Sequence, residues 1–175
     1  IGQGRFKVVR SSPFNRPVTR DQTSIVGYHG RNQSMVLAAA SNYEDGLAVG
    51  PRVRGYDIRS RRLLSVIEGN ESMAGPLCLV DIDGDGDLDA FVGGSVRGGR
   101  MPTASGSGIY LDVSEKQPKQ HSQNEALFTD VGMVIGAVWS DLFEDGYPEL
   151  ILTTHWGAIR VFDNVKGTFA EITEK

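Results

Sequence analysis

The chain has few of the residues that cross-link a protein, anchor it in a membrane or bind transition metals. Its single cysteine, Cys78, excludes an internal disulfide, and the apolar run around it predicts a small buried side chain rather than a reactive thiol. No apolar run approaches the length of about 20 residues that a membrane-spanning helix requires, so we expect no membrane insertion. The three histidines, His29, His121 and His155, are far apart and lack the spacing of metal ligands.

No stretch of the chain shows sustained helical periodicity. Its 22 glycines and 7 prolines among 175 residues are instead typical of a turn-rich all-β domain, and this length allows one domain with a hydrophobic core. The net charge of −4 comes largely from acidic loops, and we expect no nucleic-acid partner. The chain shows no signal peptide and begins with Ile1, so we expect a processed product or a fragment.

The most informative segment is the acidic loop DIDGDGDLD, which places a carboxylate at every second position of residues 81–89. Hard divalent cations such as Ca²⁺ take about six to eight oxygen ligands, and odd-numbered positions of a tight loop converge on one point. The glycines between them permit the sharp turn. An acidic turn that binds nothing is the alternative, but its carboxylates would repel one another without a cation. The predicted metal ligands are Asp81, Asp83, Asp85, Asp87 and Asp89.

An EF-hand begins with a similar pattern, but it requires a bidentate Glu at position 12 and a helix on each side. Position 12 is Val92 here, and the flanking runs GPLCLV and AFVGG predict strands. The sequence therefore predicts a calcium loop within a β-hairpin.

A degraded copy of the loop lies sixty residues downstream, where Asp141 aligns with Asp81 without a gap. Residues 126–131 (ALFTDV) also resemble residues 168–173 (TFAEIT), which predicts a similar last strand in both repeats. A fainter copy at residues 34–41 follows a loop, residues 26–34, that carries no carboxylate. A fixed period with several short strands per unit indicates the blades of a β-propeller.

The predicted fold class is therefore all-β, with about three four-stranded blades at residues 24–69, 74–132 and 134–173. Residues 4–9 (GRFKVV) resemble residues 167–172 and predict a stray outer strand before the first blade. An open arc of three blades would expose strand edges. We therefore expect either a longer propeller or a homodimer that closes a six-bladed ring, three blades from each copy.

The D-x-D-x-D-G-x-x-D loop between two strands, repeated about every sixty residues, resembles the FG-GAP/VCBS repeats of integrin α-subunit β-propellers. Residues 138–173 resemble more closely the blades of secreted bacterial proteins of the ASPIC/UnbV and cartilage-acidic-protein type, and residues 42–58 (NYEDGLAVGPRVRGYDI) are also similar to that group. The resemblance covers most of residues 26–175, and it is strong in the second repeat, good in the third and faint in the first. It implies an extracellular or periplasmic location.

The resemblance implies that the first loop binds Ca²⁺ through the side chains of Asp81, Asp83, Asp85 and Asp89 and through the carbonyl of Asp87. Within this family such ions are structural.

For the later loop the resemblance implies the side chains of Asp141, Asp145 and Glu149 and the carbonyl of Tyr147. Phe143 stands where the first loop has an acidic residue, so we expect weak or absent binding there. The loop of the first repeat should bind nothing.

The function that we expect is a calcium-stabilised scaffold for binding or adhesion, with an unidentified protein or carbohydrate as ligand and no catalysis. The alternative is a propeller-type enzyme, a lyase or glycan hydrolase, or a fragment of one, with its site at the central channel. Trp156, Tyr28 and Tyr147 suit a carbohydrate- or peptide-binding face, but packing is the expectation for each. The arginines between Arg52 and Arg62 are expected on a solvated strand edge.

Overall fold

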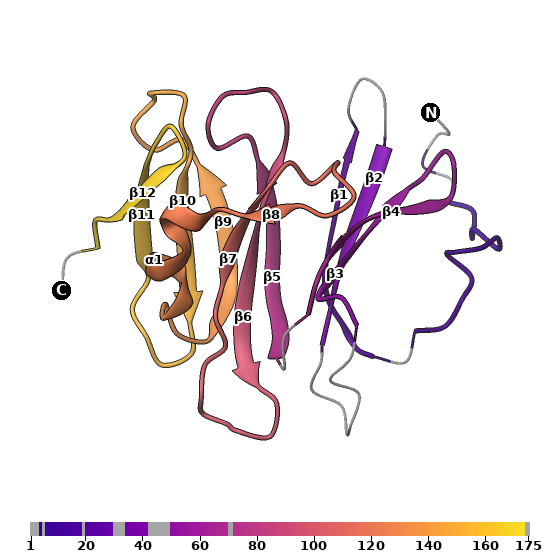
Figure 1. Ribbon diagram of the computed structural model, residues 1–175, viewed down its shortest axis with the longest axis horizontal. Coiled ribbons are helices and arrows are strands. Elements are labelled where there is room, and N and C mark those ends of the chain that lie inside the picture. The colour runs from indigo at the N-terminus through magenta and orange to yellow at the C-terminus, as the bar shows by residue number, and fades with distance from the viewer. Residues whose placement is uncertain are drawn as a thin grey trace.

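The computed structural model describes residues 4, 6–18, 20–29, 34–41, 50–69 and 72–173. Within them, three four-stranded antiparallel sheets follow one another along the chain, and the strands of each sheet lie in sequence order (Figure 1). The predicted all-β class is therefore confirmed.

The strands are joined to their neighbours as antiparallel hairpins. The first sheet contains β1 (Gln22–His29), β2 (Ser34–Ala40), β3 (Val53–Asp57) and β4 (Arg62–Ile67). The second contains β5 (Ser72–Val80), β6 (Asp89–Arg97), β7 (Gly108–Leu111) and β8 (Lys119–Gln120). The third contains β9 (Val134–Ser140), β10 (Glu149–Thr154), β11 (Arg160–Val165) and β12 (Thr168–Glu171).

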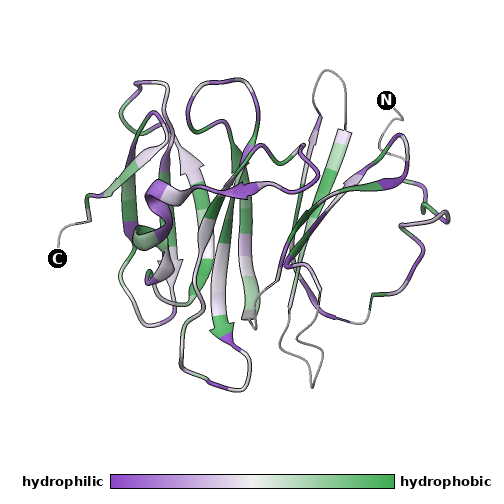
Figure 2. Cartoon of the chain, in the orientation of Figure 1, coloured by the Kyte–Doolittle hydropathy of each residue, from purple (hydrophilic) through white to green (hydrophobic). Residues whose placement is uncertain are grey.

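The second sheet packs against a neighbouring sheet on each of its faces, as Figure 1 shows. One core cluster contains Leu37 of the first sheet and Val92 of the second, and another contains Phe91 of the second sheet and Leu150 of the third. All residues of β6 except the last are buried for this reason. Figure 2 shows the hydrophobic residues concentrated along the strands.

The first strands of the second and third sheets approach each other closely. A Cβ atom on Gly75 of β5 would lie 2.8 Å from the carbonyl oxygen of Val134 in β9. Glycine in a strand permits such an approach of one backbone to another, so this contact depends on the absence of a side chain at Gly75.

A buried arginine connects the first and second sheets. Arg52 is only 3% exposed, and its Nη2 donates to the carbonyl oxygens of Gly93 (3.3 Å) and Gly106 (3.1 Å). The expected solvated edge is therefore wrong for Arg52. A buried guanidinium is tolerated when carbonyl oxygens accept its hydrogen bonds, and these acceptors come from more than forty residues downstream.

The last strand expected at residues 126–131 is a helix instead. The short 3₁₀ turn η1 (Ser122–Asn124) leads into α1 (Glu125–Thr129), and Lys119–Gln120 supply the edge strand of the second sheet. Glu, Ala and Leu at the start of α1 are strong helix formers. In the part of the chain that the structure describes, no helix has the length and apolar character that a membrane crossing requires.

The helix α1 contributes one side chain to the core between the second and third sheets. Phe128 is fully buried, and its ring centroid lies 5.7 Å from that of Phe91, 5.1 Å from that of Phe162 and 5.7 Å from that of Phe169. Aromatic rings at such distances attract one another beyond their area of burial. Phe128 therefore fastens α1 to both sheets.

The stray outer strand expected at residues 4–9 is not formed by the described part of that segment, residues 4 and 6–9. Residues 6–10 are irregular, and Phe6 is 98% exposed. A strand needs a partner for its backbone hydrogen bonds, and residues 6–10 pair with none of the described strands. Phe14 farther along packs edge-on against Tyr56 of β3, with ring centroids 6.0 Å apart. Residues 42–49, within the segment that carries the resemblance in the first repeat, lie outside the described residues.

Candidate metal centre

The acidic loop connects β5 to β6 at one end of the second sheet. The later loop, between β9 and β10, lies at the corresponding end of the third sheet (Figure 1). Its turn depends on two glycines with positive φ, Gly84 at 82° and Gly86 at 94°. Asp81 closes the turn, because its Oδ1 accepts from the Gly84 N–H at 2.7 Å and its Oδ2 from the Gly86 N–H at 2.9 Å. The loop is therefore folded around the first carboxylate.

Two further loop carboxylates, those of Asp83 and Asp85, also accept backbone hydrogen bonds. Asp83 accepts from the N–H of Asp85 at 3.2 Å, and Asp85 accepts from the N–H of Asp87 at 2.9 Å. These short-range contacts are Asx turns, which local sequence alone can form.

Asp89 differs from the others because it begins β6 and is only 3% exposed. Its Oδ2 accepts from the Ile82 N–H at 3.1 Å and its Oδ1 from the Asp112 N–H at 2.9 Å. Its position at the base of the loop is therefore set by backbone groups from two different segments.

Three carboxylates of the loop converge. One oxygen from each of Asp81, Asp83 and Asp89 lies within 4.8 Å of the others. A cation about 2.4 Å from each ligand can be shared only by oxygens less than about 4.8 Å apart, so this group could hold a metal ion. Asp85 and Asp87 do not belong to the converging group.

The electrostatics of the loop favour a positive charge at its centre. Burial raises the pKa of Asp89 to about 6, against the lowering effect of its two backbone hydrogen bonds, and Asp83 and Asp85 raise it further. The pKa of Asp87 is raised chiefly by the charge of Asp112. A bound cation would relieve both effects, since an opposite charge nearby stabilises the ionised form.

Asp112 is the residue that sequence reasoning missed. It follows β7, carries a positive φ of 48°, and its carboxylate accepts from the Ser114 N–H at 3.1 Å and hydroxyl at 2.5 Å. Thus Asp112 reaches the loop in two ways, through its N–H to Asp89 and through its charge on Asp87. No spacing rule links it to the loop, because the pairing of β6 with β7 brings it there.

The later loop between β9 and β10 has nearly the same backbone. Positive φ angles recur at Glu144 (57°) and Gly146 (87°), and Asp141 accepts from the Gly146 N–H at 3.1 Å. The Tyr147 N–H donates to Asp145 at 2.9 Å, as the equivalent amide does in the first loop. The sixty-residue repeat is therefore a repeat of loop geometry as well as of sequence.

The two loops differ in their side chains. Phe143 replaces the second carboxylate and is 56% exposed. Glu149 is fully buried; its Oε2 accepts from the Leu142 N–H at 2.6 Å, and its Oε1 has no hydrogen-bond partner. Among the described residues, the later loop does not bring three carboxylates together as the first loop does.

Comparison of the chain with protein-family models, with curated proteins and with solved structures gives no match.

Proposed function

We propose that the chain is a calcium-binding segment of a β-propeller of the FG-GAP type, and that it serves as a non-catalytic scaffold for binding outside the cytoplasm. The observation that carries the proposal is the convergence of Asp81, Asp83 and Asp89 on one point of a tight loop. Calcium is the ion that we propose, because all three converging ligands are carboxylate oxygens, which hard divalent cations prefer.

The ion would stabilise the fold rather than take part in a reaction. Asp89 connects the loop to Ile82 and Asp112, so a cation bound there joins the ends of three strands. Binding to the folded state alone stabilises it by mass action.

The propeller arrangement is supported by the equivalence of the second and third sheets. In β5 and β6, Cys78 pairs with Phe91; sixty residues later, Val138 pairs with Ile151 in β9 and β10. Phe91 is fully buried against the third sheet, whereas Val138 is 53% exposed. The outward face of the third sheet thus presents Val138 and Ile151, the positions equivalent to those by which the second sheet packs against the third.

A further blade would cover this face. In our proposal it belongs either to a longer chain or to a second copy that closes a six-bladed ring, and the mass of the protein in solution distinguishes the two. A face of this kind left open would expose a large apolar area, which monomeric proteins rarely do.

Isothermal titration of chelator-treated protein with CaCl₂ and MgCl₂ tests the metal site. We expect calcium to bind at one site with a Kd between about 10⁻⁷ and 10⁻³ M, and magnesium to bind more weakly. The Asp83→Asn variant should lose this binding. Glu125→Gln, which removes an exposed carboxylate on α1, is the matched control and should bind as the wild type does. Equal binding by Asp83→Asn and wild type would refute the proposal.

A further inference from the structure

A groove of about 530 Å³ lies on the third sheet, away from the acidic loops. It is bordered by the C-terminal end of α1 at Asp130, by the β10–β11 turn at His155, and by Arg160 and Glu171 of the last two strands. Its volume falls in the range of about 300–1,000 Å³ that is typical of small-molecule sites. The Asp141 loop and this groove lie at opposite ends of β10, because one precedes Glu149 and the other follows Thr154.

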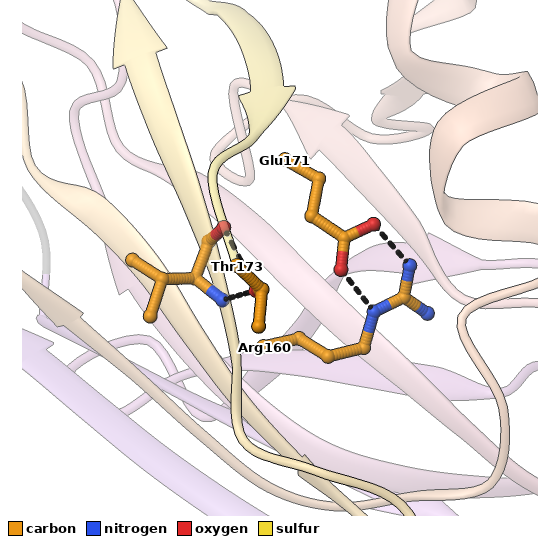
Figure 3. A network of polar contacts seen from close by, with 4 residues as sticks. Arg160, Glu171 and Thr173 are labelled. Atoms are coloured by element: carbon orange, nitrogen blue, oxygen red, sulfur yellow. Dashed lines mark hydrogen bonds and ion pairs between the residues drawn. The ribbon is translucent and has the colours of Figure 1, made fainter. Parts of the chain in front are cut away.

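The wall of the groove carries a fixed ion pair. The Nε and Nη2 of Arg160 donate to the two carboxylate oxygens of Glu171 at 2.7 and 2.6 Å (Figure 3). The guanidinium also lies over the Phe162 ring, 5.3 Å from its centroid. A bidentate pair of this kind holds both side chains in one orientation. The third nitrogen of the Arg160 guanidinium takes no part in the ion pair (Figure 3). This nitrogen gives the groove an oriented hydrogen-bond donor.

Asp130 adds a second carboxylate to the groove. The pKa of Arg160 is raised mainly by its hydrogen bond with Glu171, while partial burial lowers it. The charge of Asp130 contributes to the increase. The groove thus combines two carboxylates with a guanidinium and the imidazole of His155. Because the two carboxylates outnumber the guanidinium, an anionic ligand is disfavoured.

Trp156 lies in the turn between β10 and β11, next in sequence to His155 and Gly157, which line the groove; Trp156 is not itself a lining residue, and it is 77% exposed. Packing was the expectation for this residue, and that expectation is wrong. Its φ of 57° lies in the left-handed region, which a bulky residue rarely adopts and which costs stability. The ring contacts His155 with a centroid distance of 5.4 Å. Since the indole neither fills the core nor suits the turn, its face is available for a contact outside the chain.

We propose that this groove binds a neutral saccharide, with one sugar ring stacked on Trp156 and its hydroxyl groups hydrogen-bonded to Asp130, Glu171 and Arg160. An exposed indole offers an apolar face for the C–H groups of a sugar ring. Paired charged groups held in a plane match adjacent hydroxyls, which both donate and accept. This inference rests on the proposed binding function and names its ligand class and its place.

Titration with a panel of neutral oligosaccharides of glucose, galactose, mannose, xylose and N-acetylglucosamine tests the proposal, with heat and tryptophan fluorescence as readouts. We expect at least one to bind with a Kd below about 1 mM. Trp156→Asn should weaken that binding about tenfold, as expected for loss of a stacking aromatic ring. Asp130→Asn should weaken it by about tenfold or more, because a hydrogen bond to a charged group is lost.

Two controls separate ligand contact from structural damage. Asn suits a left-handed φ better than Trp, so Trp156→Asn should keep or raise the thermal stability while it loses the saccharide. Phe143→Ala removes another exposed aromatic ring, at the opposite end of the same sheet, and should leave the affinity unchanged. If no oligosaccharide of the panel binds while calcium still does, this inference is overturned and the proposed scaffold stands. Binding that survives both Trp156→Asn and Asp130→Asn also overturns it, since the ligand then sits elsewhere.

Discussion

The difference between the two acidic loops can be tested by repairing the later one. Its backbone repeats that of the first loop, with Gly146 donating to Asp141 as Gly86 donates to Asp81. The second carboxylate of the motif is missing, because Phe143 occupies that position. Phe143 is 56% exposed, so its replacement removes little buried area. We predict that Phe143→Asp creates a second calcium site.

The expected effect on stability changes sign with calcium. In chelator, the new carboxylate is repelled by its neighbours at a cost of about 1 kcal/mol for two charges 4 Å apart in water. With a Kd of about 10⁻⁵ M, 1 mM calcium is about 100 times the Kd and stabilises the folded state by about 2.7 kcal/mol. For a chain of this size that energy raises Tm by about 5–11 °C.

Thermal unfolding with and without calcium, combined with titration calorimetry, measures both effects. The variant should melt below the wild type in chelator and above it in 1 mM calcium, a concentration chosen as about 100 times the expected Kd. One additional calcium should bind, and the double variant Phe143→Asp with Asp141→Asn should lose it. An unchanged stoichiometry would show that the position of Phe143 does not limit binding, and the equivalence of the loops would then be of backbone only.

Three further predictions concern the core, the loop and the cysteine. Phe128→Ala removes a fully buried ring that contacts three others and should lower the free energy of unfolding, measured in urea, by about 3–5 kcal/mol. Leu142→Ala, at an exposed position, is the control and should lower it by less than about 0.5 kcal/mol. A similar loss in both variants would contradict the packing argument. Because burial raises the pKa of Asp89 from 3.8 to about 6, the calcium-free folded state holds this proton more tightly than the unfolded state. The wild type should therefore lose about 3 kcal/mol relative to Asp89→Asn as pH rises from 4 through 6, and a pH-independent difference would contradict this. Burial also raises the pKa of Cys78 to about 12, so a thiol reagent at neutral pH should modify it only in urea; rapid reaction of the folded protein would show that the thiol is accessible.

Much of the fold could be predicted from local patterns. The turn chemistry of Asp81 and its glycines, and the alternation of residues in strands such as β3, depend on neighbours in sequence. The same is true of the backbone of the later loop, which follows from Asp141 and Gly146. Where the prediction failed in detail, at residues 126–131, similarity to a strand competed with the helix propensity of Glu125, Ala126 and Leu127.

The candidate sites were less accessible to sequence reasoning. The acidic loop was visible as a motif, but it did not indicate which of its carboxylates converge, because that depends on how Asp89 is held at the start of β6. No sequence pattern connects Asp112 with the loop, since only the pairing of β7 with β6 brings it there. Packing was predicted for Trp156 and was wrong, because the residue lies in a turn at positive φ with its side chain 77% exposed, which no local pattern indicated.

The amino-acid sequence by itself determined the all-β class, the sixty-residue repeat and the acidic loop, since each rests on residues that interact within a few positions of one another. Only the tertiary structure decided which three carboxylates meet, that Arg52 is buried between two sheets, and that Arg160, Glu171 and Asp130 border one groove. These outcomes depend on strands and helix ends that are distant in sequence. Their contacts are set by sheet pairing and by the stacking of sheets, which no local pattern encodes.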